Sequence, residues 1–172
     1  MSIIPLVQIT KQDISTKGLV LRQQSLEVKD FGYEFQGIVD DLIETLMHHK
    51  IAVGLAAPQI GILLQVAVVN TSKDKTEPTL ILVNPRLVST SGKKDKKRES
   101  CMSLPYYAGE VERRSKISII YKDRFGIDAT LDAEGFLARV ISHETDHLEG
   151  MLYVDRMQDL SSLEKTDIFE ND

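Results

Sequence analysis

The residues best suited to chemistry lie in segment 142–147, which reads Ser-His-Glu-Thr-Asp-His. It contains His143 and His147, two of only four histidines in the chain, at a spacing of four residues. Positions i and i+4 of a helix share one face, so both imidazoles can bind one divalent metal ion. Glu144 follows the first histidine and can take a proton from water activated by the metal. The pattern predicts a hydrolytic metal site that needs a third protein ligand.

The surrounding sequence predicts an amphipathic helix over residues 134–149. Val140, His143 and His147 fall on one stripe at helical spacing, which turns both histidines inward. Asp132 is a candidate cap for the start of the helix, and Gly150 stands where a left-handed stop is expected. A buried histidine pair held only by hydrogen bonds is the alternative, but this motif on a capped helix favours the metal site.

The composition limits the class of protein. A chain of 172 residues suits a single domain, here expected to span residues 1–172 with a disordered acidic tail over 165–172. The net charge of −5 argues against a general nucleic-acid binder. No apolar run approaches the ~20 residues needed to cross a membrane, so we expect no membrane partner. Residues 1–10 lack the pattern of a signal peptide, and the single cysteine excludes a disulfide framework, which favours the cytoplasm.

The remaining periodicities predict an α+β fold. Residues 1–29 look irregular, and residues 35–47 form an amphipathic helix whose last turn leads into His48 and His49, interpreted as surface residues. Segments rich in Val, Ile and Leu predict the strands, which are residues 64–70, 79–88, 117–122 and 127–131, with a turn at 123–126. We therefore expect one domain in which a mostly antiparallel sheet packs around the second, metal-binding helix.

A basic run interrupts the chain before its only cysteine. It comprises Lys93, Lys94, Lys96, Lys97 and Arg98. Such a run is usually a solvated loop, and that is the structure predicted for residues 91–98. Its functional interpretation is docking to an acidic partner such as ribosomal RNA on the ribosome surface.

Cys101 is the best candidate for the third ligand. A free cysteine is often only a small buried hydrophobe, but a thiolate and two imidazoles make a good tetrahedral set with one position left for water. An ordinary zinc protease with this motif takes its third ligand downstream of the helix. The remote downstream glutamates here are Glu164 and Glu170, which lie in an acidic tail and are weaker candidates.

Three segments together resemble the peptide deformylase family. They are Val-Gly-Leu-Ala-Ala-Pro-Gln-Ile-Gly at 53–61, Glu-Ser-Cys-Met-Ser at 99–103 and His-Glu-Thr-Asp-His-Leu-Glu-Gly at 143–150. The resemblance runs from about Leu6 to Met157. Each motif alone is weak or moderate, whereas all three in this order are specific.

The resemblance implies a role for each matching residue. Cys101, His143 and His147 would bind the metal, most commonly Fe(II) in this family, with Zn(II), Ni(II) or Co(II) as alternatives. Glu144 would act as the general base and then as the general acid. The Gln59 side chain and the Met102 backbone N–H would donate to the oxyanion, and Glu99 and Arg113 would form a supporting ion pair. The residues that would bind substrate are Val53, Gly54, Leu55 and Ser100.

The implied activity is metal-dependent hydrolysis of the N-formyl group from the N-terminal methionine of nascent polypeptides, which releases formate. The sequence departs from the usual family pattern at Ala52, Ser100, Met102, Ala108 and Ser142. Ser100 matters most, since it would either carry strain at a positive φ or narrow the cleft. Two alternatives therefore stay open: a deformylase-like amidohydrolase with another formylated substrate, and a catalytically silent homologue that binds peptides.

Overall fold

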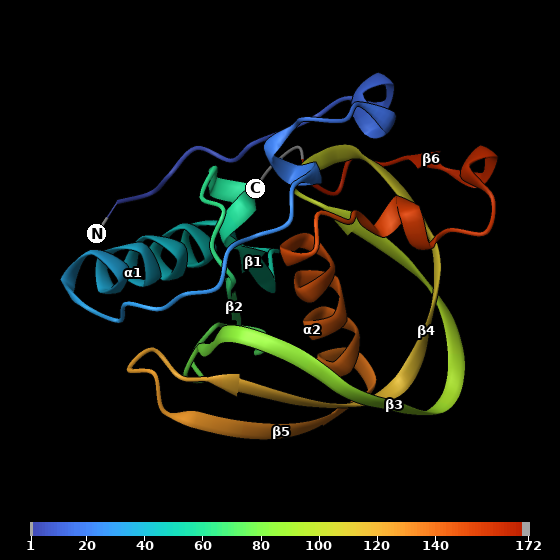
Figure 1. The fold of residues 1–172 in the computed structure, drawn as a ribbon. Helices are drawn as coiled ribbons and strands as arrows, with labels where there is room; N and C mark the ends of the chain where they lie inside the picture. The colour runs from blue at the N-terminus through green and yellow to red at the C-terminus, as the bar shows by residue number, and fades with distance from the viewer. Residues whose placement is uncertain (1, 170–172) are drawn as a thin grey trace.

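A six-stranded antiparallel sheet dominates residues 2–169, the part of the chain that the computed structural model describes (Figure 1). In sequence order its strands are β1 (Gly54–Ala56), β2 (Val66–Val69), β3 (Leu80–Cys101), β4 (Leu104–Lys122), β5 (Asp128–Glu134) and β6 (Glu164–Lys165). The first five follow one another in the sheet, so β1 lies at an edge, while β6 pairs with β4.

Helix α2 (Gly135–Leu148) lies inside the curve of this sheet, and α1 (Tyr33–His48) lies outside it, against β1 and β2 (Figure 1). The apolar face of α1 buries Phe35, Val39, Leu42 and Leu46 in the core. This arrangement confirms the predicted α+β fold with a mostly antiparallel sheet around the second helix. Most of the helix that carries both histidines is therefore enclosed by the sheet.

The boundaries of α2 follow from its neighbours. Gly150 has a φ of 73°, which confirms the predicted left-handed stop. The predicted cap at Asp132 is wrong, because Asp132 lies within β5, opposite Ser118, and the cap position belongs to Glu134. Strand pairing continues to Glu134, so the chain turns into the helix only at Gly135, whose φ is 65°.

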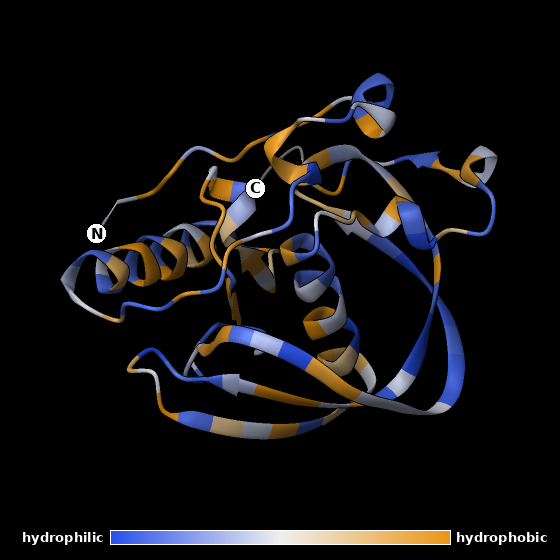
Figure 2. Cartoon of the chain, viewed as in Figure 1, coloured by the Kyte–Doolittle hydropathy of each residue, from blue (hydrophilic) through white to orange (hydrophobic). Residues whose placement is uncertain are grey.

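The basic run is a strand and not the predicted loop. β3 pairs with β4 from Lys94 opposite Arg114 to Arg98 opposite Glu110, so the hairpin extends far beyond the predicted strands. The lysines are compatible with a strand because Lys94 pairs with Glu112 at 2.6 Å and cross-strand contacts of this kind offset the lack of apolar packing. Figure 2 shows this arching half of the hairpin as hydrophilic.

The irregular N-terminal segment forms backbone hydrogen bonds with residues close to Cys101. Its described residues form short 3₁₀ turns at Lys11–Ser15 and Val20–Arg22 and an isolated bridge from Leu26 to Leu64, in agreement with its prediction as irregular. The Val7 N–H donates to the Gln59 carbonyl at 2.7 Å, and the Ile9 N–H donates to the Ser103 carbonyl at 2.8 Å. These two hydrogen bonds attach the N-terminal segment to the 3₁₀ turn that contains Gln59 and to the turn that follows Cys101.

The C-terminal segment differs from the predicted disordered tail over its described part. Lys165 pairs with Tyr107 in β6, and Ile168 and Phe169 reach the pocket that contains the cysteine. Phe169 explains the difference, because its partly buried side chain packs against the core, whereas Ile168 stays exposed. Residues 170–172 of the predicted tail lie outside the described residues. Within residues 2–169, no helix is long and apolar enough to span a membrane.

Candidate active site

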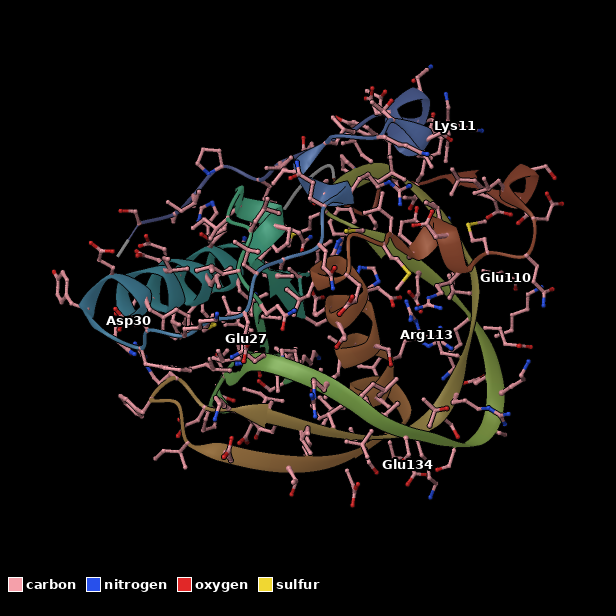
Figure 3. All side chains as sticks on the ribbon, in the orientation of Figure 1. Lys11, Glu27, Asp30, Glu110, Arg113 and Glu134 are labelled. Carbon is pink, nitrogen blue, oxygen red and sulfur yellow. The ribbon has the colours of Figure 1, made fainter. Side chains whose placement is uncertain are left out.

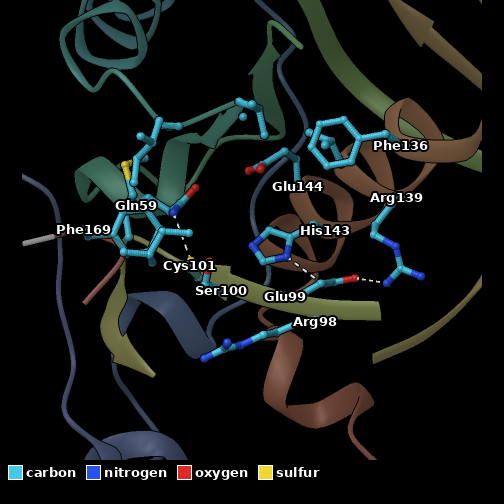
Figure 4. Close-up of a pocket in the computed structure, with 17 residues that line it drawn as sticks. Gln59, Arg98, Glu99, Ser100, Cys101, Phe136, Arg139, His143, Glu144 and Phe169 are labelled. Atoms are coloured by element: carbon cyan, nitrogen blue, oxygen red, sulfur yellow. Dashed lines mark hydrogen bonds and ion pairs between the residues drawn. The ribbon is translucent and has the colours of Figure 1, made fainter. Parts of the chain in front are cut away.

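Cys101, His143 and His147 meet at the centre of the molecule. One ligand atom from each lies within 4.8 Å of the others, and the Cys101 Sγ is 3.3 Å from the His147 Nε2. Cys101 ends β3, and the two histidines are one helical turn apart on α2. Figure 4 shows Cys101 and His143 on these two elements. The three residues predicted as ligands therefore converge, although 42 residues separate the cysteine from the first histidine.

The position of the cysteine follows from a tight turn. Cys101 pairs with Leu104, so only Met102 and Ser103 connect the two long strands. The turn aims the end of the hairpin at α2, and the N-terminal segment fixes it through the Ser103 carbonyl. A cysteine at the last strand position before such a turn has little freedom to move.

The ring of His143 is oriented by a buried carboxylate. Its Nδ1 lies 3.1 Å from Glu99, and Arg113 holds the same carboxylate with two bonds of 2.7 and 3.0 Å. Arg113 also donates to Asp146 at 2.9 Å, in the interior seen in Figure 3. Because Glu99 accepts from Nδ1, the lone pair of Nε2 remains available to a metal. The predicted ion pair between Glu99 and Arg113 is therefore present.

The cluster stabilises charge despite its burial. Burial alone would raise the pKa of the Cys101 thiol, but the contacts with His147 and His143 outweigh it and hold that pKa well below its ordinary value. Burial would likewise lower the pKa of His143, but its bonds to Cys101 and Glu99 raise it well above the usual range. The thiolate is the form of Cys101 that binds metal, and a bound metal ion would take the place of the proton on His143.

This donor set fits a divalent metal ion. The three atoms are close enough to share one ion, and one imidazole is already oriented from behind by a carboxylate. The Nδ1 of His147 is buried and has no hydrogen-bond partner among the described residues, so the surrounding protein alone does not satisfy this polar ring. A histidine pair held only by hydrogen bonds, the alternative interpretation of the motif, does not account for these features.

Gln59 and Glu144 flank the three ligands. The Ala56 N–H donates to the Gln59 Oε1 at 2.9 Å, which turns the amide nitrogen toward Cys101, 3.4 Å from its Sγ. The Glu144 Oε2 is buried and has no hydrogen-bond partner among the described residues. Burial raises the pKa of Glu144 to about 7, against the opposing effect of positive charge on His143 and His147. A carboxyl that titrates near neutrality suits proton transfer.

These groups open onto a pocket of about 270 Å³. Val53, Gly54 and Ser100, which the sequence analysis assigns to substrate binding, line it, and so does Met102. Leu55 does not line it, because its side chain is fully buried in the core, and the expected contact of Leu55 with substrate stays a prediction. Side chains alternate along a strand, so Leu55 points away from the face on which Gly54 lies.

Comparisons with known proteins agree with this site. The sequence model of the polypeptide deformylase family matches residues 7–162. Peptide deformylase 1 of Vibrio vulnificus is 42% identical over 140 residues, which cover 81% of this chain and 82% of the relative. The chain belongs to the peptide deformylase family.

Solved structures of peptide deformylases have the same fold. That of Legionella pneumophila has a TM-score of 0.82 at 32% identity, over 94% of this chain and 89% of the other. The enzyme of Synechococcus elongatus, solved in complex with actinonin, has a TM-score of 0.80 at 33% identity, over 94% and 90% of the two chains. Members of this family are metal-dependent hydrolases, which agrees with the donor set described above.

Ser100 carries no backbone strain in this deformylase-family chain. Among the described residues, only Lys75 and Asn84 have a positive φ without being glycine. Of the two expected consequences of Ser100, strain at a positive φ is therefore wrong. Ser100 lines the pocket, so its remaining expected consequence is a smaller space for a ligand.

Several residues of the deformylase site were not predicted from the sequence. Phe136, Arg139 and Phe169 line the pocket. Phe136 and Arg139 precede His143 on the same helix, seven and four residues away, and that spacing is a signal that a helical projection would have given. The competing candidate ligand Glu164 lies exposed in β6 against Arg98, and Glu170 lies outside the described residues.

Proposed function

We propose that this chain hydrolyses the N-formyl group from the N-terminal methionine of newly made polypeptides and releases formate. The observation that carries the proposal is the convergence of Cys101, His143 and His147 beside Glu144, whose carboxyl is buried and titrates near neutral pH. Together with membership of the peptide deformylase family, this arrangement supports the hydrolysis of a formamide rather than of an ordinary peptide bond.

We assign the metal site to Cys101, His143 and His147. Fe(II) is the proposed ion, and Zn(II), Ni(II) and Co(II) suit the same mixed sulfur and nitrogen donors. When bound, such an ion lowers the pKa of water and polarises a carbonyl oxygen. The protein contributes the thiolate form of Cys101 and the fixed ring of His143.

Glu144 is the proposed proton carrier. Water that attacks the formyl carbon must lose a proton, and the departing amine must gain one. A carboxyl with a pKa of about 7 is present in both forms near neutral pH, so Glu144 can accept the first proton and deliver it to the nitrogen. The C–N bond then breaks to leave formate and a free N-terminal amine.

Gln59 and Met102 are the proposed oxyanion donors. The amide nitrogen of Gln59 already points at Cys101 and also lies 3.3 Å from the Ser103 Oγ. The backbone N–H of Met102 belongs to the turn that follows the cysteine. Fixed donors of this kind stabilise negative charge without reorganisation, and the loss of one such donor costs about 3 kcal/mol in known hydrolases.

The edge strand β1 is the proposed guide for the peptide. Its inner face carries Gly54, where a Cβ would collide with the Glu144 carboxylate, so the glycine keeps the backbone close to the proton carrier. An exposed strand edge can bind an extended peptide through backbone hydrogen bonds. Val53 and Val140 supply apolar lining for the methionine side chain.

We also propose a cytoplasmic location, where nascent chains are available as substrate. Contact with the ribosome surface through the basic run of β3 is a further proposal, supported by the exposure of Lys94, Lys96 and Lys97. Each of these lysines is already paired with a carboxylate, so the contact would have to compete with those pairs.

Formate release tests the activity. Protein loaded anaerobically with Fe(II), or with Ni(II), is mixed with a formyl-Met tripeptide. The released formate and the metal content of the protein are both measured. We expect kcat/KM of about 10⁴ M⁻¹s⁻¹ or more, typical of ordinary enzymes. Glu144→Ala should lose at least about 10²-fold by removing the general base. Glu149→Ala, which alters an exposed glutamate at the C-cap of the same helix, serves as the matched control.

Each outcome separates the hypotheses. Turnover that is lost in Glu144→Ala and kept in Glu149→Ala supports the proposal. A metal-filled protein that leaves the formyl-Met peptide intact but deformylates another formylated amine would indicate the alternative substrate, for which Ser100 in the pocket wall is the structural reason. A metal-filled protein that turns over none of these would indicate a silent peptide-binding homologue.

A further inference from the structure

The buried carboxylate of Glu99 accepts a full set of hydrogen bonds. A carboxylate has about four lone-pair positions, two on each oxygen. Oε1 accepts from Arg113 at 2.7 Å and from Arg139 at 2.6 Å. Oε2 accepts from Arg113 at 3.0 Å and faces the His143 Nδ1 at 3.1 Å. Each oxygen thus has two partners, and Arg139 supplies one of the four.

Arg139 is placed for this contact by the helix. It lies four residues before His143, on the same face of α2, so both side chains reach one carboxylate from the same side. Figure 4 shows its guanidinium turned toward Glu99. Its side chain is 8% exposed, and it also donates to the carbonyls of Val111 at 3.0 Å and Asp95 at 2.6 Å.

Arg139 is the guanidinium that Glu99 does not share with Asp146, whose second partner is Arg156. The buried carboxylates of Glu99 and Asp146 face the buried guanidinium groups of Arg113 and Arg139. Arg113 is divided between the two carboxylates, because it bonds both. Without Arg139, Oε1 would keep a single donor, and the carboxylate could rotate away from the imidazole of His143.

We propose that Arg139 is a positioning residue for the metal ligand His143 and acts through Glu99. This inference rests on the proposed metal site. Arg139 fixes the orientation of the carboxylate, the carboxylate fixes the ring, and the ring presents Nε2 to the metal. Partners of this outer kind typically change metal affinity by 10- to 100-fold, although they never touch the ion.

A purely structural role is the competing explanation. The bonds to the Val111 and Asp95 carbonyls tie the N-terminal half of α2 to the hairpin, so the loss of Arg139 would also lower stability. The two roles differ in what they affect. A tie between elements changes the melting temperature of the metal-free protein, whereas a positioning residue changes the affinity and the spectrum of metal bound to folded protein.

Co(II) titration separates them, because a thiolate–Co(II) site absorbs visible light. Four proteins are compared: wild type, Arg139→Met, Arg139→Lys and the control Arg124→Met. Arg124 also ties two elements, through bonds of 2.7 Å to Gln36 and Asp40, but it lies outside the Glu99 cluster. Circular dichroism establishes that each protein is folded at the temperature of the titration.

We expect Arg139→Met to weaken Co(II) binding by about tenfold or more and to change the absorption bands. Arg139→Lys keeps a cationic donor for Glu99 but cannot reach both carbonyls, so it should recover most of the affinity and little of the melting temperature. Arg124→Met should lower the melting temperature alone. If Arg139→Met fails to fold, the comparison of Arg139→Lys with Arg124→Met decides.

Two results would overturn the inference. One is an unchanged affinity and spectrum in folded Arg139→Met, and the other is an affinity that follows the melting temperature across all four proteins. A wild-type protein that fails to bind Co(II) would instead contradict the proposed metal site itself, so the two failures are distinguishable.

Discussion

Strand β3 carries charged residues in two adjacent regions that have different environments. The basic stretch, residues 93–98, is open to solvent: the side chains of Lys94 and Lys96 are 59% and 49% exposed. The next residue, Glu99, is 6% exposed and belongs to a buried cluster with Arg113, Arg139 and Asp146. Both regions contain ion pairs at similar distances, and only their exposure to water separates them.

Exposure changes what an ion pair contributes. Water screens the charges of a surface pair, and two long side chains lose conformational freedom when they form it. Such a pair therefore contributes about 0–1 kcal/mol to the free energy of unfolding. A buried charge has lost its hydration, and the removal of its partner typically costs about 3–5 kcal/mol. The basic stretch can therefore change with little effect on the fold, whereas the buried cluster has to stay complete. The complete cluster is also the one that orients His143.

The largest expected effect is that of Glu99→Ala. It leaves the guanidinium groups of Arg113 and Arg139 buried without their shared carboxylate, and we expect a loss of about 3–5 kcal/mol in the free energy of unfolding. Urea unfolding of the metal-free protein measures the loss. Glu110→Ala is the matched control, since Glu110 lies opposite Arg98 on the same hairpin and pairs with Lys96 in an exposed contact.

Glu99→Gln sharpens this prediction. The amide keeps the shape and one accepting oxygen but loses the charge and replaces an acceptor with a donor that faces a cation. We expect a smaller loss than in Glu99→Ala and a larger one than in Glu110→Ala. Equal losses for Glu99→Ala and Glu110→Ala would mean that burial does not separate the two regions.

Much of the site could be predicted because local sequence encodes it. The spacing of His143 and His147 fixes their common face, and the choice of Cys101 over Glu164 as ligand followed from donor chemistry. The left-handed stop at Gly150 and the irregular N-terminal segment also follow from residue types alone. Each of these predictions depends on a few neighbouring positions or on the chemistry of one side chain.

The rest depends on contacts between distant residues. Arg139 contributes to the site only because β3 brings Glu99 next to α2, across 40 positions of the chain. The basic stretch looked like a loop because a run of lysines is unfavourable in an isolated strand, and the glutamates that compensate it lie on β4. The side chain of Leu55 lies in the core although the neighbouring Gly54 lines the pocket, because a strand divides its residues between two faces.

A small effect is expected when the basic stretch is altered. Lys94→Ala and Lys96→Ala each remove one exposed cross-strand pair, and we expect losses of about 0.2–1 kcal/mol that shrink as salt is added. Thermal unfolding in low and high salt measures both. A loss of several kcal/mol in either variant, or one that salt leaves unchanged, would indicate that the stretch contributes to the fold in the way the buried cluster does.

The smallest effect concerns Asp95, which joins the two regions because its backbone carbonyl accepts from Arg139 while its side chain faces Lys97 at 3.0 Å. The hydrogen bond from Lys97 lowers the pKa of Asp95 below its ordinary value of 3.8. A carboxyl with a lowered pKa stabilises the fold above that ordinary value, and the contribution is lost as the pH falls through the folded-state pKa. Lys97→Ala should return the pKa of Asp95 toward 3.8, as measured by NMR titration of its carboxyl carbon. A pKa that stays low without Lys97 would instead assign the shift to the charges of Lys93 and Arg139.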